Sequence, residues 1–492
     1  MTTLDAIVIG SGPVATLNAV SLDPSLTIGW TVFKDKTAKL KQGVHLVNGK
    51  KVKEGLEEEL YERVIESSEM VFDPKQPEEG KLNIYTVQPN QQLSLDTLPI
   101  TDETLIVLAT KSYSNEDVLE QLKPLLDVAN PTIVLTQNGV APEIRVNEWL
   151  EKEGYDKVKV VRGVALGPCT YDKDDPTILN NNIHDLVFGH WNAENHEGHE
   201  EATTTVVEAY THLPTKSGGN NFKGTSISKA LVNLINPISI LFANSIGEAL
   251  ESSLISNLYL SCFEEGLAVF KDQGITLEPR NTLDSSLFMY DAARPHMPSM
   301  GRDTFVAIQG GEDYQFPLET ETIDLSGQIA VLGKEAGITT YWNSLCADLV
   351  DDFCKSFNEI KEQGGSDIAA EFAVRFVTRN RHIAGLDPYQ LHNRARDFDV
   401  VEDLQEGVKK RFAEVDTNLP KAVYLCPSLA SPNTSLPNLS QSLINSYQQL
   451  KLGYSQHLSQ SNVQFDLQIA ECPNTEVCSK RKTISPVCLR PT

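Results

Sequence analysis

Short apolar runs alternate with segments of helical spacing along the first two hundred residues. The runs cover residues 6–9, 27–33, 105–109, 132–135 and 158–161. Residues 14–20 and 115–128, between them, place apolar side chains three or four positions apart, as amphipathic helices do. Because the runs do not alternate with polar residues, both faces should be buried, which is typical of a parallel sheet covered by helices. The pattern predicts a doubly wound α/β domain over residues 1–215.

The pattern changes near residue 220. Residues 226–275 and 326–362 carry apolar positions at helical spacing with few strand signals, which predicts an all-helical second domain over residues 220–350. Between them, residues 280–320 hold the proline and glycine punctuation of a long loop. Residues 351–425 predict a partly helical extension. Residues 426–492 are rich in Ser, Asn, Gln and Pro, which predicts a mostly disordered tail.

The chain is strongly acidic, with 42 Lys and Arg against 67 Asp and Glu and a formal net charge of -25. Nearly all of the negative excess lies in the first 350 residues. Such a surface repels nucleic acid and anionic membranes, so we expect neither as a partner. An anionic ligand must therefore be held by local backbone amides and a few lysines.

Cysteine use and the N-terminus predict a cytoplasmic protein. The 8 cysteines form no CxxC pair, and the chain enters a strand almost at once without a secretory signal. No apolar run approaches the roughly 20 residues that a membrane helix needs. Cys472, Cys478 and Cys488 fit no zinc spacing, and the His- and Glu-rich residues 190–201 lack an HExxH motif and predict a solvent-exposed loop. No metal site is predicted.

A glycine-rich segment joins the first strand to the first helix. It reads Gly10-Ser11-Gly12-Pro13-Val14-Ala15. In this context Gly10 permits a tight turn, Gly12 lets the backbone approach a pyrophosphate, and Ala15 allows close packing of helix on strand. The helix N-terminus adds a positive dipole end. All six residues are predicted to bind a dinucleotide.

The choice between NADP and NAD depends on the end of the second strand. Asp35 follows Ala15 by about 20 residues, the distance at which a carboxylate holds the ribose diol of NAD. Lys34 and Lys36 flank it, and either can pair with the 2′-phosphate of NADP. All three can also be solvated loop charges. We expect NADP and keep NAD as the alternative.

Further polar residues follow in a suggestive order. Lys111 and Asn138 come just after two predicted strands, where the ligand crevice of a doubly wound sheet opens. On a predicted helix, Lys229 and Asn233 are four residues apart and share one face, and Asn236 at i+7 is expected to join them. Reduction of a ketone requires a proton donor as the hydride arrives, and Lys229 is the candidate.

This series of motifs resembles the ketopantoate reductase (2-dehydropantoate 2-reductase) family over about residues 5–350. Beyond the glycine loop, the matching segments are Ala109-Thr110-Lys111, Gln137-Asn138-Gly139, Lys229 with Asn233, Ser299-Met300-Gly301-Arg302-Asp303 and Thr320-Glu321-Thr322-Ile323-Asp324. The resemblance implies a Rossmann-type domain followed by an all-helical domain of the 6-phosphogluconate-dehydrogenase-like type. It also implies reduction of 2-dehydropantoate to pantoate by NAD(P)H, in pantothenate biosynthesis, and a possible homodimer.

The resemblance also implies roles for individual residues. Lys111 and Asn138 would line the nicotinamide side of the crevice, and Lys229 would act as catalytic proton donor. Asn233, Asn236 and Ser299 would bind the keto acid. Glu321 would be the second catalytic residue, positioning a hydroxyl or the lysine.

Two departures from the family pattern leave other functions open. The family usually places its two helix asparagines four apart, whereas Asn236 follows Asn233 by three, and the segment between Ser299 and Glu321 is longer than usual. These departures favour, as an alternative, a reductase of another keto acid or an opine-type dehydrogenase. A second alternative is a non-catalytic dinucleotide-binding sensor or scaffold that uses the 351–492 extension.

Overall fold

The computed structural model describes residues 2–48, 62–87, 98–166, 169–171, 175, 177–181, 185–191, 198–277, 298–309, 316 and 320–386. The chain forms two compact units: unit 1 holds Met1–Asn233 and Gly274–Thr282, and unit 2 holds Leu234–Gln273 and Leu283–Thr492. The division falls after Asn233, beyond the 215–220 expected from the sequence, because helix α6 (Phe222–Val232) packs on strands of unit 1. The predicted tail, 426–492, lies outside the described residues.

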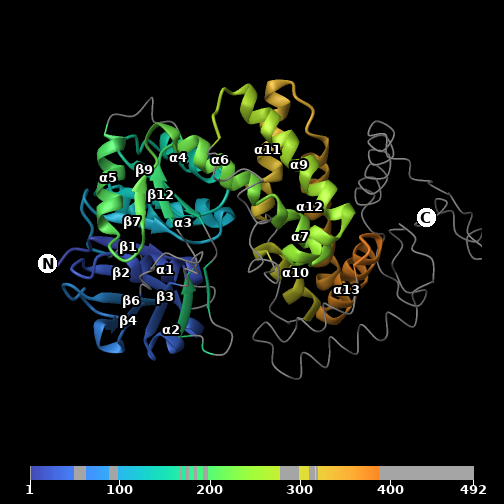
Figure 1. Cartoon of the computed structure of the whole chain (residues 1–492). Helices are drawn as coiled ribbons and strands as arrows, with labels where there is room; N and C mark the ends of the chain where they lie inside the picture. The colour runs from blue at the N-terminus through green and yellow to red at the C-terminus, as the bar shows by residue number, and fades with distance from the viewer. Residues whose placement is uncertain are drawn as a thin grey trace, which may run out of the picture. The chain divides into compact units, whose positions relative to one another are not determined.

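Six strands of unit 1 form a parallel sheet in the order β6-β2-β1-β7-β8-β9 (Figure 1). They are β1 (Ala6–Ile9), β2 (Ile28–Phe33), β6 (Leu82–Val87), β7 (Leu105–Leu108), β8 (Thr132–Leu135) and β9 (Lys159–Leu166). This is the 3-2-1-4-5-6 order of the Rossmann fold, so the predicted doubly wound sheet is confirmed. The edges are extended by β5 (Met70–Phe72) on one side and by β12 (Asp185–Gly189) and β13 (Thr215–Ser217) on the other.

Helices cover both faces of this sheet. Successive residues of each strand point to opposite faces, so each strand contributes side chains to two separate clusters. On one side, Val8, Val107 and Val134 share a buried cluster with α1 (Pro13–Ser21) and α5 (His199–Ala209). On the other side, the neighbouring strand positions pack with α3 (Asn115–Leu126) and α4 (Ala141–Glu153). The short helix α2 (Lys34–Leu40) begins directly where β2 ends.

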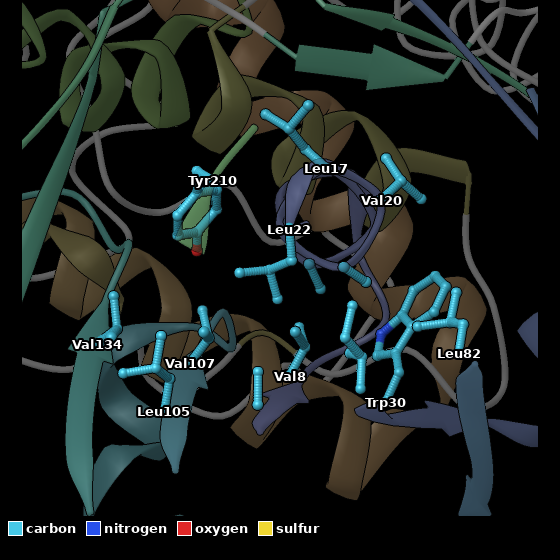
Figure 2. Close-up of a cluster of buried hydrophobic side chains, with 14 of the residues drawn as sticks. Val8, Leu17, Val20, Leu22, Trp30, Leu82, Leu105, Val107, Val134 and Tyr210 are labelled. Atoms are coloured by element: carbon cyan, nitrogen blue, oxygen red, sulfur yellow. The ribbon is translucent and has the colours of Figure 1, made fainter. Parts of the chain in front are cut away.

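A second, smaller sheet in unit 1 has the strand order β10-β11-β3-β4. Its strands are β3 (Val44–Asn48), β4 (Glu62–Ile65), β10 (Cys169–Tyr171) and β11 (Ile178–Asn181). Helix α1 contacts both this sheet and β1, which explains why every residue from Ala15 to Ser21 is buried. Figure 2 shows Leu17 and Val20 on the side of α1 away from the strands of Val8 and Val107, and Leu22 on the near side. A helix packed on both sides needs no polar face.

Within the described residues, unit 2 is all helical, as predicted (Figure 1). Its elements are α7 (Ile235–Phe242), α8 (Ile246–Glu251), α9 (Ser253–Asp272), α10 (Ser299–Gln309), the 3-10 turn η7 (Glu321–Asp324), α11 (Ser326–Ala336), α12 (Tyr341–Gly364) and α13 (Ser366–Ile383). Helix α12 continues through the boundary expected at residue 350. Phe353 on α12 stacks on Phe372 and Phe376 of α13, with ring centroids 5.8 Å and 4.3 Å apart.

The expectation of a continuous loop over residues 280–320 is wrong for residues 299–309. They form α10, whose buried side chains Met300, Thr304 and Ile308 follow helical spacing. Pro298 stands immediately before the helix, so the proline that suggested a loop marks the helix start.

One helical stretch of the described chain, Gly219–Phe242, is long and apolar enough by composition to cross a membrane. However, 94% of its apolar window is buried inside the protein, which is the usual position of a core helix.

Candidate active site

The glycine loop begins at the C-terminal end of β1, next to β7, where the strand order of the sheet reverses. Gly10 has a φ of 138°, and a Cβ there would lie 2.7 Å from the carbonyl oxygen of Ala109. The Nε1 of Trp30 donates a 2.8 Å hydrogen bond to the Gly10 carbonyl. The protein itself therefore requires glycine at this position, and Trp30 holds the turn in place. Ligands of doubly wound sheets bind at this reversal point.

Gly12 is different, because the protein leaves space around it. It is the N-cap of α1 with a φ of -83°, and a Cβ built there meets nothing within 4 Å. The folded chain would therefore accept a larger residue at position 12. Open space beside the positive end of a helix is what an approaching pyrophosphate needs. The residues present thus fit a dinucleotide.

Buried hydrogen bonds fix the orientation of α1. The Asn18 Nδ2 donates to the Val14 carbonyl at 2.7 Å, and the Tyr210 hydroxyl donates to the Asn18 Oδ1 at 2.6 Å. Burial raises the pKa of Tyr210, so its hydroxyl remains a neutral donor. The helix N-terminus is thereby held against the sheet.

The loops after β7 and β8 are tied together by Gln137. Its Nε2 donates to the Asn115 Oδ1 at 2.6 Å and to the Thr110 carbonyl at 3.0 Å, and Asn115 donates back at 2.9 Å. These bonds position the loops that carry Lys111, which is half-buried, and Asn138. No role was predicted for Gln137 from the sequence. Its place in the QNG motif beside Asn138 was the available signal.

Helix α6 brings two predicted site residues together. The Nδ2 of Asn233 donates a 2.9 Å hydrogen bond to the Oδ1 of Asn138. Lys229 lies one turn earlier, and the Asn233 N–H donates to its carbonyl at 3.0 Å, so both residues share a face. Burial lowers the pKa of Lys229 to about 8. Such an ammonium is mostly protonated at neutral pH and gives up its proton more readily than an ordinary lysine.

Asn236 lies beyond the end of α6, so the face that it is predicted to share with Lys229 stays a prediction. Asn233 is the C-cap of α6, and Asn236 lies in the next helix, α7. The helix breaks because Pro237 has no N–H to donate to the carbonyl of Asn233. The role predicted for Asn236 in substrate binding stays a prediction.

The remaining predicted residues are placed as follows. Glu321 opens η7 in unit 2 and is buried, and Ser299 opens α10. The side chains of Ser299, Lys34 and Lys36 lie outside the described residues, and α2 begins at Lys34. The convergence of Glu321, Asn236 and Ser299 on Lys229 stays a prediction.

The segment expected to be a solvent-exposed loop is in part a buried histidine pair. His190 and His199 are 6% and 8% exposed. Their Nδ1 atoms are 2.7 Å apart, and the Nδ1 of His190 is 2.5 Å from the Val160 carbonyl. The two histidines are buried because His190 directly follows β12 of the central sheet and His199 is the first residue of α5, which packs on that sheet. Over the part of the chain that the structure describes, no group of three His, Cys, Asp or Glu is arranged to hold a metal ion.

Arg162 on β9 is another buried residue of this region that the sequence analysis missed. Its Nη1 donates a 2.5 Å hydrogen bond to the Oγ of Ser226 on α6. The single charge in the apolar run 160–166 was the signal.

Comparison with protein families gives two matches along the chain. Residues 7–193 match the family model "Ketopantoate reductase PanE/ApbA", and residues 221–353 match the model of the C-terminal part of the same family. No curated protein matches the chain.

Solved structures of similar fold are remote in sequence. The 2-dehydropantoate 2-reductase from Geobacter metallireducens GS-15 is 16% identical with a TM-score of 0.51, covering 70% of this chain and 98% of that one. A PanE/ApbA family ketopantoate reductase from Ralstonia eutropha JMP134 is 15% identical with a TM-score of 0.47, covering 70% and 96%. D-mandelate dehydrogenase with NADH and anilino(oxo)acetate is 16% identical with a TM-score of 0.48, covering 70% and 96%. At these identities the likeness concerns the fold.

Proposed function

This chain belongs to the ketopantoate reductase family, oxidoreductases that act on a CH–OH group, and we propose that it reduces a 2-keto acid with NADPH. The observation that carries the proposal is the link from Lys229, through the Asn233–Asn138 hydrogen bond, to the loops at the reversal point of the sheet. The glycine loop at the same point has space for a pyrophosphate at Gly12. The first substrate to test is 2-dehydropantoate.

We propose that Gly10–Ala15 and Lys111 hold the cofactor, with Asn138 on its nicotinamide side. Lys34 and Lys36 stand in the first turn of α2, where the adenosine ribose of a dinucleotide lies in this fold. Two lysines there favour the 2′-phosphate of NADP over NAD. The bound nicotinamide supplies the hydride that reduces the keto carbon.

Lys229 would donate the proton to the carbonyl oxygen, where negative charge develops. Its ammonium loses the proton, becomes a neutral amine and is reprotonated from solvent. Asn233, Asn236 and Ser299 would bind the keto acid, and Glu321 would position the lysine or a substrate hydroxyl. The lowered pKa of Lys229 suits this role, because the donor is charged before the reaction and neutral after it.

The position of Asn236 on a separate helix favours testing substrates beyond 2-dehydropantoate. We further propose that the protein acts in the cytoplasm, in pantothenate biosynthesis, and that it forms a homodimer. A panel of 2-keto acids, with and without an amino acid as a co-substrate, separates the ketopantoate reductase reaction from another reduction and from an opine-type condensation. Tight NADPH binding without turnover of any panel member would indicate a sensor.

The test measures NADPH and NADH oxidation with 2-dehydropantoate, using the wild type and Lys229→Ala. The substitution should lower kcat by about a hundred- to ten-thousandfold, as expected for loss of a general acid, and leave the Kd for NADPH unchanged. Because the donor must be protonated, wild-type kcat should fall as the pH rises through about 8. Lys216→Ala, on an exposed lysine of β13, is the matched control. Full turnover by Lys229→Ala would show that the assigned chemistry is wrong.

A further inference from the structure

Arg162 is a buried charge among the apolar residues 160–166 of β9. It is 2% exposed, and its neighbours Val160, Val161 and Val164 are buried. A guanidinium stays protonated at any physiological pH, so its burial costs free energy that only well-placed partners offset. Arg162 lies on the sheet face covered by α4 and contacted by α6, because it alternates with Val160 along β9.

One partner of Arg162 lies on the helix that carries Lys229. The Nη1 of Arg162 donates a 2.5 Å hydrogen bond to the Oγ of Ser226, which is fully buried. Ser226 precedes Lys229 by three residues, so the two side chains share a face of α6. One turn beyond Lys229, Asn233 bonds to Asn138. Lys229 therefore stands between two hydrogen bonds, or tethers, that tie α6 to β9 and to the loop after β8.

Both tethers act at the same end of the sheet. Arg162 pairs in register with Leu135, the last residue of β8, and Asn138 lies three residues further along the chain, in the loop that follows β8. The first tether fixes α6 to the strand, and the second fixes its end to the loop.

Glu143, in the first turn of α4, lies near enough to Arg162 for the two groups to interact electrostatically. It is 1% exposed, and its Oε1 accepts a 2.6 Å hydrogen bond from the backbone N–H of Trp191. Burial raises the pKa of Glu143 to about 7, while the charges of Arg162 and Lys223 act in the opposite direction. The Nζ of Lys223 on α6 lies 5.7 Å from the Trp191 ring. Strand β9 and helices α4 and α6 thus contribute ionisable groups to one cluster.

We propose that Arg162 and Ser226 form a positioning pair that fixes the Lys229 ammonium relative to the loops after β7 and β8. The inference rests on the proposed role of Lys229 as proton donor. Without the pair, α6 keeps the Asn233 tether and its helical bonds, but its middle is free to shift. The ammonium then gains water, so the pKa of Lys229 rises toward the value of an ordinary lysine. Cofactor binding, which depends on the glycine loop, is retained.

The experiment compares Ser226→Ala with Thr225→Val in the full chain. Both delete a buried hydroxyl from adjacent positions of α6, but the Thr225 Oγ1 donates locally, to the carbonyl of the helix N-cap Asn221 at 3.4 Å. Ser226→Ala should lower kcat by about ten- to a hundredfold, the effect of slight misplacement of a reacting group. It should also move the alkaline limb of the kcat profile against pH to values above pH 8, and it should leave the Kd for NADPH unchanged. Thr225→Val should resemble the wild type.

A double-mutant cycle with Arg162→Met tests whether the two residues act through one bond. Ser226→Ala should cost no further activity in the Arg162→Met background. Loss of a buried arginine can unfold unit 1. If Arg162→Met does not fold, the kcat and pH profile of Ser226→Ala alone test the inference.

Two results for Ser226→Ala would overturn the inference. One is a kcat, and an alkaline limb of the kcat profile against pH, that are both the same as in the wild type. The other is a parallel fall of kcat, NADPH affinity and Tm, which general destabilisation produces. Lys229→Ala, measured alongside, separates the hypotheses. If Lys229→Ala keeps full turnover, the proposed function and the positioning role both fail. If it loses turnover while Ser226→Ala does not, only the positioning role fails.

Discussion

Gly10 and Gly12 belong to one motif but are glycines for different physical reasons. Gly10 has a positive φ, and the Ala109 carbonyl occupies the place where its Cβ would lie. Gly12 has an ordinary backbone conformation and open space around it. The folded chain requires the first glycine, whereas only the proposed dinucleotide would require the second, so the two substitutions should have different consequences.

We predict that Gly10→Ala lowers stability and that Gly12→Ala lowers only cofactor affinity. A Cβ at position 10 collides with backbone that cannot move away cheaply, and the positive φ adds about 1 kcal/mol of strain. At position 12 a methyl group meets only the ligand. Thermal unfolding and NADPH titration by fluorescence distinguish the two effects. Equal loss of stability in both variants would contradict this assignment.

Glu143 should make stability depend on pH. Its folded pKa, about 7, lies above the ordinary value of 4.5, so the native state favours the protonated form. This contribution is complete below pH 4.5 and is lost as the pH rises to about 7. Relative to Glu143→Gln, the wild type should therefore lose unfolding free energy on the order of 3 kcal/mol between pH 4.5 and 7.

Urea denaturation at pH 5, 6, 7 and 8 measures this difference. Glu148→Gln, on an exposed position of the same helix, is the control. A difference between wild type and Glu143→Gln that stays constant over this range would show that the Glu143 carboxyl is not perturbed as described.

At the scale of elements, α13 completes unit 2 although it lies beyond the family match, which ends at residue 353. The C-terminal carbonyls of α7 would lack partners without it. The Asn380 Nδ2 donates to the Leu241 carbonyl at 2.8 Å, and the Arg381 Nη1 donates to the carbonyls of Phe242 and Ala243. Arg381 also pairs with Glu248 at 2.5 Å, with both side chains buried. The helix therefore belongs to the core of the unit.

We predict that Arg381→Met destabilises the protein by about 3–5 kcal/mol, because it leaves Glu248 buried without its cation. Arg375→Met is the matched control. Arg375 also pairs with a glutamate, Glu371, but that pair is partly exposed on the surface of α13 and should contribute only about 0–1 kcal/mol. Guanidinium denaturation compares the two. Similar small losses would mean that α13 does not hold the end of α7.

At the scale of the whole molecule, the acidic surface opposes the binding of an anionic cofactor. The formal net charge is -25, and NADPH is itself strongly negative. Under the proposed function, local groups such as the α1 N-terminus and Lys111 would bind the cofactor against a repulsive long-range field. Salt screens the long-range field more effectively than it screens contacts within a site.

The association rate of NADPH should therefore rise with ionic strength. We expect an increase of about two- to fivefold between 0.01 and 0.15 M salt, over which the Debye length falls from roughly 30 Å to 8 Å. Stopped-flow fluorescence at several salt concentrations provides the measurement. A rate that falls with added salt would show that local lysines attract the cofactor more strongly than the whole surface repels it.

The parts of the fold that depend on local pattern could be predicted from the sequence. The central parallel strands are buried on both faces and therefore apolar throughout, so runs such as 105–109 and 132–135 marked β7 and β8 closely. The glycine loop and the i, i+4 pair Lys229 and Asn233 were also legible, because their geometry is set by neighbours in the chain. These features were enough to indicate a dinucleotide fold and a lysine on a helix.

Contacts between distant segments had to come from the tertiary structure. Strand β3 pairs with β11, more than a hundred residues later, through backbone hydrogen bonds that carry no side-chain signature. Arg162 and Ser226 are 64 residues apart, and neither residue indicates the other. The sequence by itself determined the Rossmann-type sheet, the helical second unit and the order of the site residues, because these follow from periodicity and turn chemistry. Only the tertiary structure decided where α6 is anchored and that α13 caps α7, because burial and pairing of distant polar groups depend on how the whole chain packs.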